Sequence, residues 1–237
     1  LTCEELGNAQ LRIAKNHGWV FEIPADATAM VDPVPLRAMG RFTHEAACVD
    51  PVTGYIYQTE DNDAGLLYRF IPDVPGKLAE GGRLQILTLN DGPKDARNRD
   101  SIAMKIGQKH AIAWVDIDDV ESPEADLHIR GAAMGGVKFA RGEGIHMGDG
   151  ELYFCCTSGG AKELGQIFRL ALAEDGSARL QLFFESDDPT QFHYGDNLTV
   201  SPNGHLIVCE DQSGDVSTNH LRGITPTGEA YPLAWLT

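Results

Sequence analysis

The stretch TGYIYQTEDNDAGLLYRFIP, residues 53–72, contains two runs rich in Tyr, Ile, Leu and Phe, separated by Asn, Asp and Gly. Short apolar runs bounded by such turn residues are typical of a β-hairpin. The same form recurs twice, with GELYFCCTSGG before GQIFRLAL (150–172) and NGHLIVCEDQSGD before HLRGITPTGEAYPL (203–233). Helical periodicity is scarce along the chain, so the sequence predicts an all-β fold.

The hairpins form an internal repeat, whose conspicuous strands end at Glu4, Glu60, Asp116, Thr157 and Glu210. A propeller blade of four short strands takes about 40 to 50 residues, and insertions fall in its loops. The sequence therefore predicts a single β-propeller domain over residues 1–237, with four to five blades represented. Because the chain starts in what reads as the end of a strand, we expect the propeller to be incomplete on its N-terminal side.

Composition narrows the classes of function. The chain has 35 acidic and 19 basic residues, for a formal net charge of −16, which disfavours nucleic acid as a partner and suits metal cations. No apolar run approaches the roughly 18 residues that span a membrane. Five cysteines without CxxC spacing argue against a disulfide framework or a zinc knuckle.

Three strands run directly into acidic residues, in LTCEE (1–5), YIYQTED (55–61) and LIVCED (206–211). One such ending is usually an exposed polar turn. In a propeller, however, corresponding strand ends meet around one axis, where several carboxylates cannot all stay ionised without cations. Three endings in register therefore favour a metal site.

Other segments add candidate ligands. In ARGEG (140–144), Arg141 and Glu143 share one side of an extended chain, which fits either an oxyanion held beside a metal or an Arg–Glu ion pair between strands. Asp196 and Asn197 offer oxygen ligands suited to Ca²⁺. Cys3 offers a thiolate, which indicates a transition metal such as iron or zinc.

The motifs of several hydrolase classes are missing. The His44–Glu45 pair does not continue into HExxH, because position 48 is Cys48. No GxSxG elbow and no P-loop motif with its Gly-Lys pair occurs in the sequence. A surplus of carboxylates without a serine elbow favours a reaction activated by metal.

Together, LTCEE, GRFTHEAACVDPVTGYIYQTED, GLLYRFIP, FARGEGI, the YFCCTSGG–GQIFRL hairpin and GDNLTVSPNGHLIVCED resemble the PhoX-type alkaline phosphatases, in order and over nearly the whole chain. The resemblance implies a six-bladed propeller with Fe³⁺ and Ca²⁺ at its axis. It further implies hydrolysis of small phosphate monoesters in the periplasm or outside the cell, after Tat-dependent export. We expect the protein to be a monomer.

By motif, the resemblance assigns Cys3, Glu45 and Glu143 to iron, and Arg141 to the phosphate. These four residues form the catalytic set that it implies. The remaining acidic and amide positions resemble the calcium set, without an assignment to individual ions. They are Glu4, Glu5, Glu60, Asp196, Asn197, Glu210 and Asp211.

Two other functions are compatible with parts of the sequence. Calcium-dependent lactonases are also propellers with Asn, Asp and Glu at the axis, and DNLTVSPNGHLIV (196–208) suits them equally. They need neither the thiolate of Cys3 nor an arginine placed like Arg141. A non-catalytic propeller with structural Ca²⁺ is the third possibility.

Overall fold

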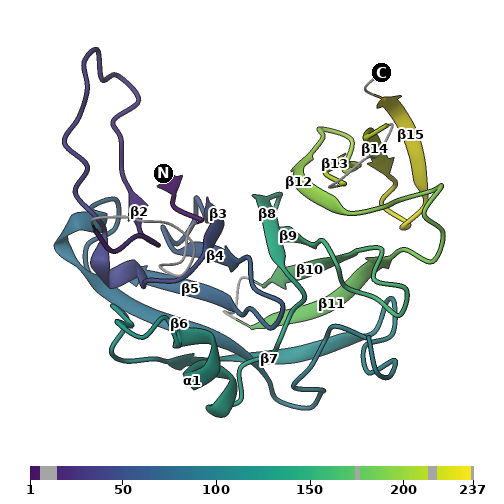
Figure 1. Cartoon of the computed structure of the whole chain (residues 1–237), viewed down its shortest axis with the longest axis horizontal. Helices are drawn as coiled ribbons and strands as arrows, with labels where there is room; N and C mark the ends of the chain where they lie inside the picture. The colour runs from purple at the N-terminus through teal and green to yellow at the C-terminus, as the bar shows by residue number, and fades with distance from the viewer. Residues whose placement is uncertain (6–14, 174–176, 213–217, 236–237) are drawn as a thin grey trace.

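The computed structural model describes residues 1–5, 15–173, 177–212 and 218–235. Most of this chain forms antiparallel strands, arranged along an open arc (Figure 1). The predicted all-β fold is confirmed. Three four-stranded meanders of the form expected for propeller blades occur among the described residues, and the predicted number of blades stays a prediction.

The hairpin at residues 53–72 forms the centre of the first meander. Its strands pair in chain order: β3 (His44–Val49), β4 (Ile56–Glu60), β5 (Leu67–Pro72) and β6 (Gly82–Leu89). The short 3₁₀ helix η2 (Leu78–Glu80) connects the last two strands.

The second and third meanders repeat this order. The second contains β8 (Gly142–Met147), β9 (Glu151–Cys156), β10 (Gln166–Leu172) and β11 (Ala178–Glu185). The third contains β12 (Gly195–Val200), β13 (Leu206–Glu210), β14 (His220–Ile224) and β15 (Ala230–Trp235). The first strands, β3, β8 and β12, lie next to one another on the inner side of the arc (Figure 1).

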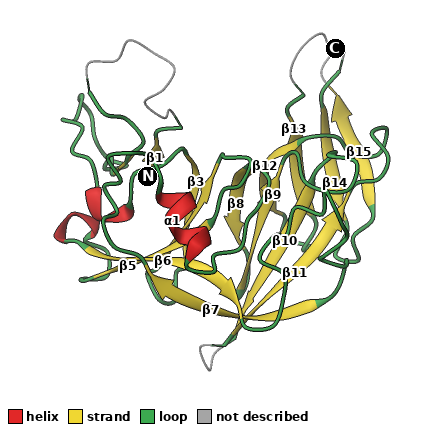
Figure 2. Cartoon of the chain, turned by 60° about the horizontal axis from the view of Figure 1, so that its bottom comes forward, coloured by secondary structure: helices red, strands yellow, loops and turns green. Residues whose placement is uncertain are grey.

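Strand β7 (Lys109–Asp116) joins the first two meanders into one nine-stranded sheet, pairing with β6 on one edge and β11 on the other. Figure 2 shows it on the outer side of the arc, away from β3, β8 and β12. Asp116, which pairs with Gln85 on β6, therefore does not occupy the position of Glu60, Thr157 and Glu210. The equivalence that the sequence suggested for this strand end is wrong, because an apolar run does not reveal which sheet edge it joins.

Short elements complete the fold. Strand β1 (Thr2–Cys3) pairs with β2 (Val20–Phe21), and the Glu4 carbonyl accepts a hydrogen bond from His44 N at the start of β3. The 3₁₀ helix η1 (Arg37–Met39) and helix α1 (Leu127–Ala133) pack beside the first meander. No helix in the described part of the chain is long and apolar enough to cross a membrane.

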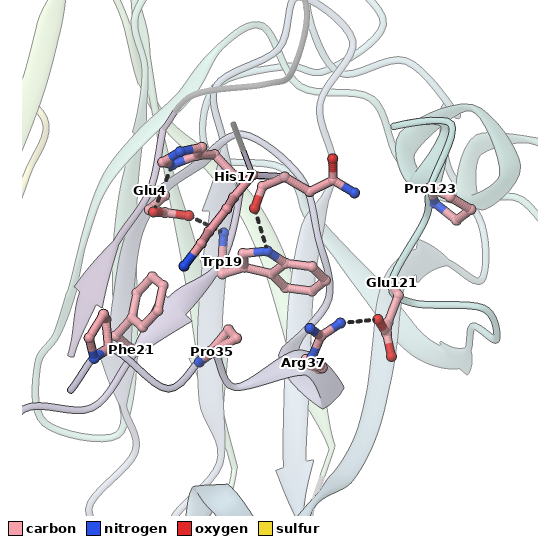
Figure 3. Close-up of a pocket in the computed structure, with 11 residues that line it drawn as sticks. Glu4, His17, Trp19, Phe21, Pro35, Arg37, Glu121 and Pro123 are labelled. Atoms are coloured by element: carbon pink, nitrogen blue, oxygen red, sulfur yellow. Dashed lines mark hydrogen bonds and ion pairs between the residues drawn. The ribbon is translucent and has the colours of Figure 1, made fainter. Parts of the chain in front are cut away.

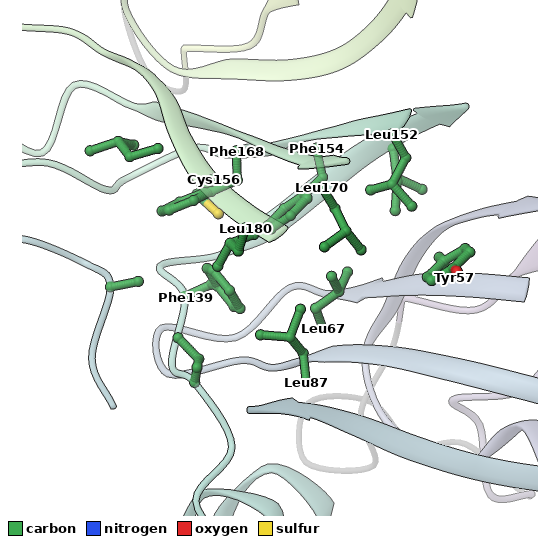
Figure 4. Close-up of a cluster of buried hydrophobic side chains, with 14 of the residues drawn as sticks. Tyr57, Leu67, Leu87, Phe139, Leu152, Phe154, Cys156, Phe168, Leu170 and Leu180 are labelled. Atoms are coloured by element: carbon green, nitrogen blue, oxygen red, sulfur yellow. The ribbon is translucent and has the colours of Figure 1, made fainter. Parts of the chain in front are cut away.

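An aromatic core joins the first two meanders. Phe139, Phe154 and Phe168 lie with ring centroids 5.0 to 5.3 Å apart, and Leu67 and Leu87 pack onto them from the first meander (Figure 4). Burying large aromatic side chains supplies much of the free energy of folding. This core fixes the first meander against the second, and thereby fixes β3 beside β8.

Candidate active site

The first strand of each meander contains a β-bulge at the same place. In the first meander His44 pairs with Glu60, but the next pair is Ala47 with Gln58, so two residues of β3 oppose one of β4. The shift lies between Gly142 and Ile145 in β8, and between Gly195 and Leu198 in β12. Bulges of this kind redirect side chains.

The residues that begin the three bulges are Glu45, Glu143 and Asp196. Each offers a carboxylate oxygen, and these atoms all lie within 4.8 Å of one another. Glu143 is only 2% exposed, and the other two are half-buried. We call these three residues the carboxylate trio.

Glycines allow the strands to approach closely enough to form the trio. A Cβ at Gly144 would lie 2.6 Å from Asn197 Cα, which no packed side chain tolerates. Two threonine hydroxyls reinforce the approach, Thr59 donating to the Glu143 carbonyl and Thr157 to the Gly195 carbonyl. Gly144 therefore lets β8 and β12 converge, and the hydroxyls connect each meander to the next.

The trio is electrostatically unfavourable without a cation. Burial, followed by the charges of Asp61 and Asp196, raises the pKa of Glu143 to about 9. Burial and the charge of Asp196 raise the pKa of Glu45 to about 7. The pKa of Asp196 is also raised, by burial and by Asp211. Converging carboxylates of this kind favour protonation or a bound cation.

Arg141 lies two residues before Glu143, the trio residue of β8, and points to the same side. Its Nε and Nη2 donate to the two oxygens of Asp61 at 2.8 and 3.0 Å, and Nη2 also donates to Glu143 at 2.8 Å. The bonds to Asp61 raise the pKa of the guanidinium. Its φ of 56° is a left-handed conformation that is uncommon for a residue other than glycine. Strained backbone of this type often occurs at functional sites.

The N-terminal segment places alternate side chains on opposite sides, as an extended chain does. Strand β1 contacts β3, which brings Cys3 near Glu45. Burial and then the negative charge of Glu45 raise the pKa of the Cys3 thiol to about 11. Burial and Asp61, to which it is hydrogen bonded, raise the pKa of Glu5. Cys3 and Glu5 thus face the site from β1 and the residues that follow it.

Glu4 points away from this site. Its carboxylate accepts hydrogen bonds from Gly18 N at 3.1 Å and Trp19 N at 3.2 Å, and pairs with His17 Nδ1 at 2.8 Å (Figure 3). It lines a cavity of about 880 Å³, together with Trp19, Phe21 and other side chains. The structure does not bring Glu4 to the trio.

The carboxylate of Glu60 also lies outside the trio and is bound by other groups. It is 2% exposed and accepts hydrogen bonds from Leu66 N at 3.1 Å and from the Tyr68 hydroxyl at 2.9 Å. His128 Nδ1 lies 3.3 Å from its other oxygen. These bonds hold the turn after β4.

Glu210, at the equivalent end of β13, has the same kind of surroundings. It accepts from His193 N and His220 N at 3.0 Å and from Arg222 Nε at 2.8 Å. The structure therefore brings neither Glu60 nor Glu210 into the trio, although the sequence predicted both as calcium ligands.

The residues that follow these two glutamates face the site instead. Asp61 accepts hydrogen bonds from Arg141. The negative charge of Asp211 raises the pKa of Asp196. Asn197 is exposed and donates to Asp196 Oδ1 at 3.0 Å. Asp61 was not among the predicted site residues, yet alternation could have found it, because a buried Glu60 at a strand end directs its neighbour to the opposite side.

The residues present fit bound metal. Glu45, Glu143 and Asp196 supply hard oxygen donors, and their raised carboxyl pKa values indicate that Arg141 alone does not offset the negative charge of the site. Cys3 adds a sulfur donor near Glu45. Carboxylate oxygens suit Ca²⁺, and a thiolate suits a transition metal.

The raised pKa values predict that metal binding depends on pH. A cation binds the ionised carboxylate, so any cation that enters the trio, including Ca²⁺ added as a probe ion to the metal-free protein, must displace a proton from Glu143 at any pH below about 9. We expect the apparent Ca²⁺ affinity of the metal-free protein to rise about tenfold per pH unit between pH 7 and 9. Calorimetry in buffers of different ionisation enthalpy measures the released proton. Glu151→Gln, remote from the trio on β9, is the control, and an affinity that is flat over this range would contradict the prediction.

Neighbouring substitutions test the division between Glu60 and Asp61. Glu60→Gln should lower the free energy of unfolding by about 1 to 3 kcal/mol, because it disturbs buried hydrogen bonds, and should leave the calcium content unchanged. Asp61→Asn should instead weaken calcium binding with a smaller effect on stability. Urea denaturation and elemental analysis of both variants provide the readouts. Loss of calcium from Glu60→Gln would restore Glu60 as a ligand.

Comparisons with known proteins place the chain in a family. The family model for alkaline phosphatase PhoX matches residues 3–236. Among solved structures, the chain is similar to Pseudomonas fluorescens PhoX in complex with vanadate, a transition state analogue, with 22% identity and a TM-score of 0.66. This match covers 93% of the present chain and 48% of the other, so the chain spans about half the length of that protein.

A luciferin-regenerating enzyme also matches, with 12% identity and a TM-score of 0.33, over 84% of this chain and 78% of the other. That likeness is too low to support an argument. No curated protein matches the chain significantly. The family model, in contrast, extends over almost every residue and agrees with the resemblance found in the sequence motifs. The chain belongs to the alkaline phosphatase PhoX family.

Proposed function

We propose that this protein hydrolyses phosphate monoesters and releases inorganic phosphate at the carboxylate trio. The observation that carries the proposal is the convergence of Glu45, Glu143 and Asp196 beside Arg141. It joins a set of oxygen donors for cations with a guanidinium that can bind a phosphoryl group. Membership of the PhoX family and the vanadate complex of the Pseudomonas fluorescens protein support it.

We assign Fe³⁺ to Cys3, Glu45 and Glu143. Ca²⁺ belongs to the surrounding oxygen donors, which include Asp196 and also Asp61, which the sequence prediction omitted. When bound, these ions supply positive charge that stabilises the phosphoryl oxygens in the transition state. The hydrogen bonds to Asp61 and Glu143 orient Arg141 toward the carboxylate trio, where these ions would bind.

Arg141 binds the phosphoryl group in this proposal. Among the described residues, its bonds to Asp61 and Glu143 use Nε and Nη2, which leaves Nη1 for a phosphoryl oxygen. The side chain is 40% exposed, so a substrate can reach it from solvent. Two carboxylates that fix the guanidinium reduce the conformational entropy that substrate binding would otherwise cost.

A periplasmic or extracellular location and a monomeric state are further parts of the proposal. The location rests on the family resemblance.

Elemental analysis combined with a p-nitrophenyl phosphate assay tests the function. We expect iron and calcium in the purified protein, and loss of activity after calcium chelation that added Ca²⁺ reverses. Calcium without iron, together with lactone hydrolysis, would favour a lactonase. Active protein that is free of iron and indifferent to chelation would refute the metal assignment.

Arg141→Ala should lower kcat/KM by about 10² to 10³, because it removes a charge that stabilises the transition state. Metal content should change little, since the trio remains. Steady-state kinetics and elemental analysis provide the readouts. The matched control is Arg83→Ala, which removes an exposed Arg–Asp pair on the outer strands and should leave kcat/KM within about twofold. Equal effects of the two substitutions would contradict a role of Arg141 in phosphate binding.

A further inference from the structure

Arg141 is held between two turns that belong to different meanders. Its backbone N–H donates to Asn62 O at 2.9 Å, in the turn after β4. Its carbonyl accepts from Thr157 N at 3.1 Å, in the turn after β9. A left-handed φ of 56° is unfavourable for arginine, so the hydrogen bonds to these two turns hold the backbone in this conformation. The position of the guanidinium therefore depends on the distance between the two turns.

Arg99 connects the same two turns from a third segment, the connection between β6 and β7. Its Nη1 donates to Asp63 Oδ1 at 2.6 Å, one residue beyond Asn62. Its Nη2 donates to Ser158 Oγ at 2.8 Å and to Ser158 O at 3.2 Å, one residue beyond Thr157. One planar guanidinium thus bridges the residues adjacent to both backbone partners of Arg141.

The segment that carries Arg99 is itself firmly held. Asn98, 3% exposed, accepts from the backbone N–H groups of Ala103 and Met104 and donates to Glu185 Oε2 at 2.7 Å. Arg97 O accepts from Gly160 N at 2.8 Å. These bonds attach the segment that carries Arg99 to β11 and to the turn after β9, and so fix the position from which Arg99 bridges the two turns.

The bridge is more than a surface ion pair. Asp63 is 62% exposed, and an ion pair so open to water contributes little to stability. The Arg99 side chain is only 20% exposed and forms hydrogen bonds to two separate turns. Its expected effect is therefore on the geometry of the turns, and much less on the stability of the fold.

We propose that Arg99 is a positioning residue that holds Arg141 in its phosphate-binding orientation by bridging Asp63 and Ser158. This inference rests on the proposed function for its effect on catalysis. Its structural part, the restraint on the Arg141 backbone, stands independently. The described hydrogen bonds of Arg99 go to Asp63 and Ser158 and to none of the trio residues, so we expect metal binding to be unchanged by its loss.

Kinetics of Arg99→Ala test the catalytic part. We expect kcat/KM for p-nitrophenyl phosphate to fall about 10-fold to 100-fold and the inhibition constant of inorganic phosphate to rise, with iron and calcium unchanged. Arg99→Lys, which keeps the charge but cannot bridge both turns as a planar fork, should be intermediate. Arg83→Ala is again the matched control.

A double-mutant cycle separates positioning from a general loss of stability. In an Arg141→Ala background, Arg99→Ala should change kcat/KM by less than about twofold, because the group that it positions is already missing. The same 10-fold to 100-fold loss in both backgrounds would overturn the proposal.

Amide hydrogen exchange tests the structural part whether or not the protein is a phosphatase. Arg99→Ala should accelerate exchange at the amides of Arg141 and Thr157, and Arg83→Ala should not. Unchanged exchange at both amides would overturn the inference even in an active enzyme. A wild-type protein that neither hydrolyses p-nitrophenyl phosphate nor binds inorganic phosphate would refute the proposed function instead, and the exchange result would still decide the role of Arg99.

Discussion

The close approach of β8 to β3 on one side and β12 on the other is the constraint on which the site depends. It requires glycine at position 144, where a Cβ would meet Asn197 Cα at 2.6 Å. The threonine hydroxyls at the ends of β4 and β9 reinforce it through the carbonyls of the next meander. Because each inner strand also has a bulge at this level, the approach brings one carboxylate from each meander to a common point.

That convergence opposes folding in the absence of cations. The carboxyl pKa values of Glu45 and Glu143 are raised because burial and neighbouring charges both disfavour ionisation. The aromatic core between the first two meanders provides favourable burial that offsets part of this repulsion. A site that gathers like charges in a rigid frame can bind a multivalent cation with little rearrangement, which is the property that charge-stabilising catalysis requires.

Much of this arrangement could be predicted from the sequence. The hairpin pattern gave the all-β fold, and the family motifs pointed to Glu45, Glu143 and Arg141, which the structure places together. The bulges could not be predicted, because they arise from pairing between strands. Without knowledge of the bulges, the sequence predicts that Glu60 and Glu210, which end apolar strands, are metal ligands at the axis. In the structure both glutamates are buried, Glu60 beside the Tyr68 hydroxyl and Glu210 beside Arg222. These are tertiary contacts that no local sequence pattern encodes.

The ends of β4 and β13 show how one acidic pair serves two purposes. Glu60 and Glu210 each accept hydrogen bonds from the turns that follow them, and so fix where the next residue points. Asp61 then binds Arg141, while Asp211 raises the pKa of Asp196. The first carboxylate of each pair thus stabilises the turn, and the second contributes charge to the site. Adjacent acidic residues at a strand end need not be two ligands of one metal, because alternation directs them to opposite sides of the strand.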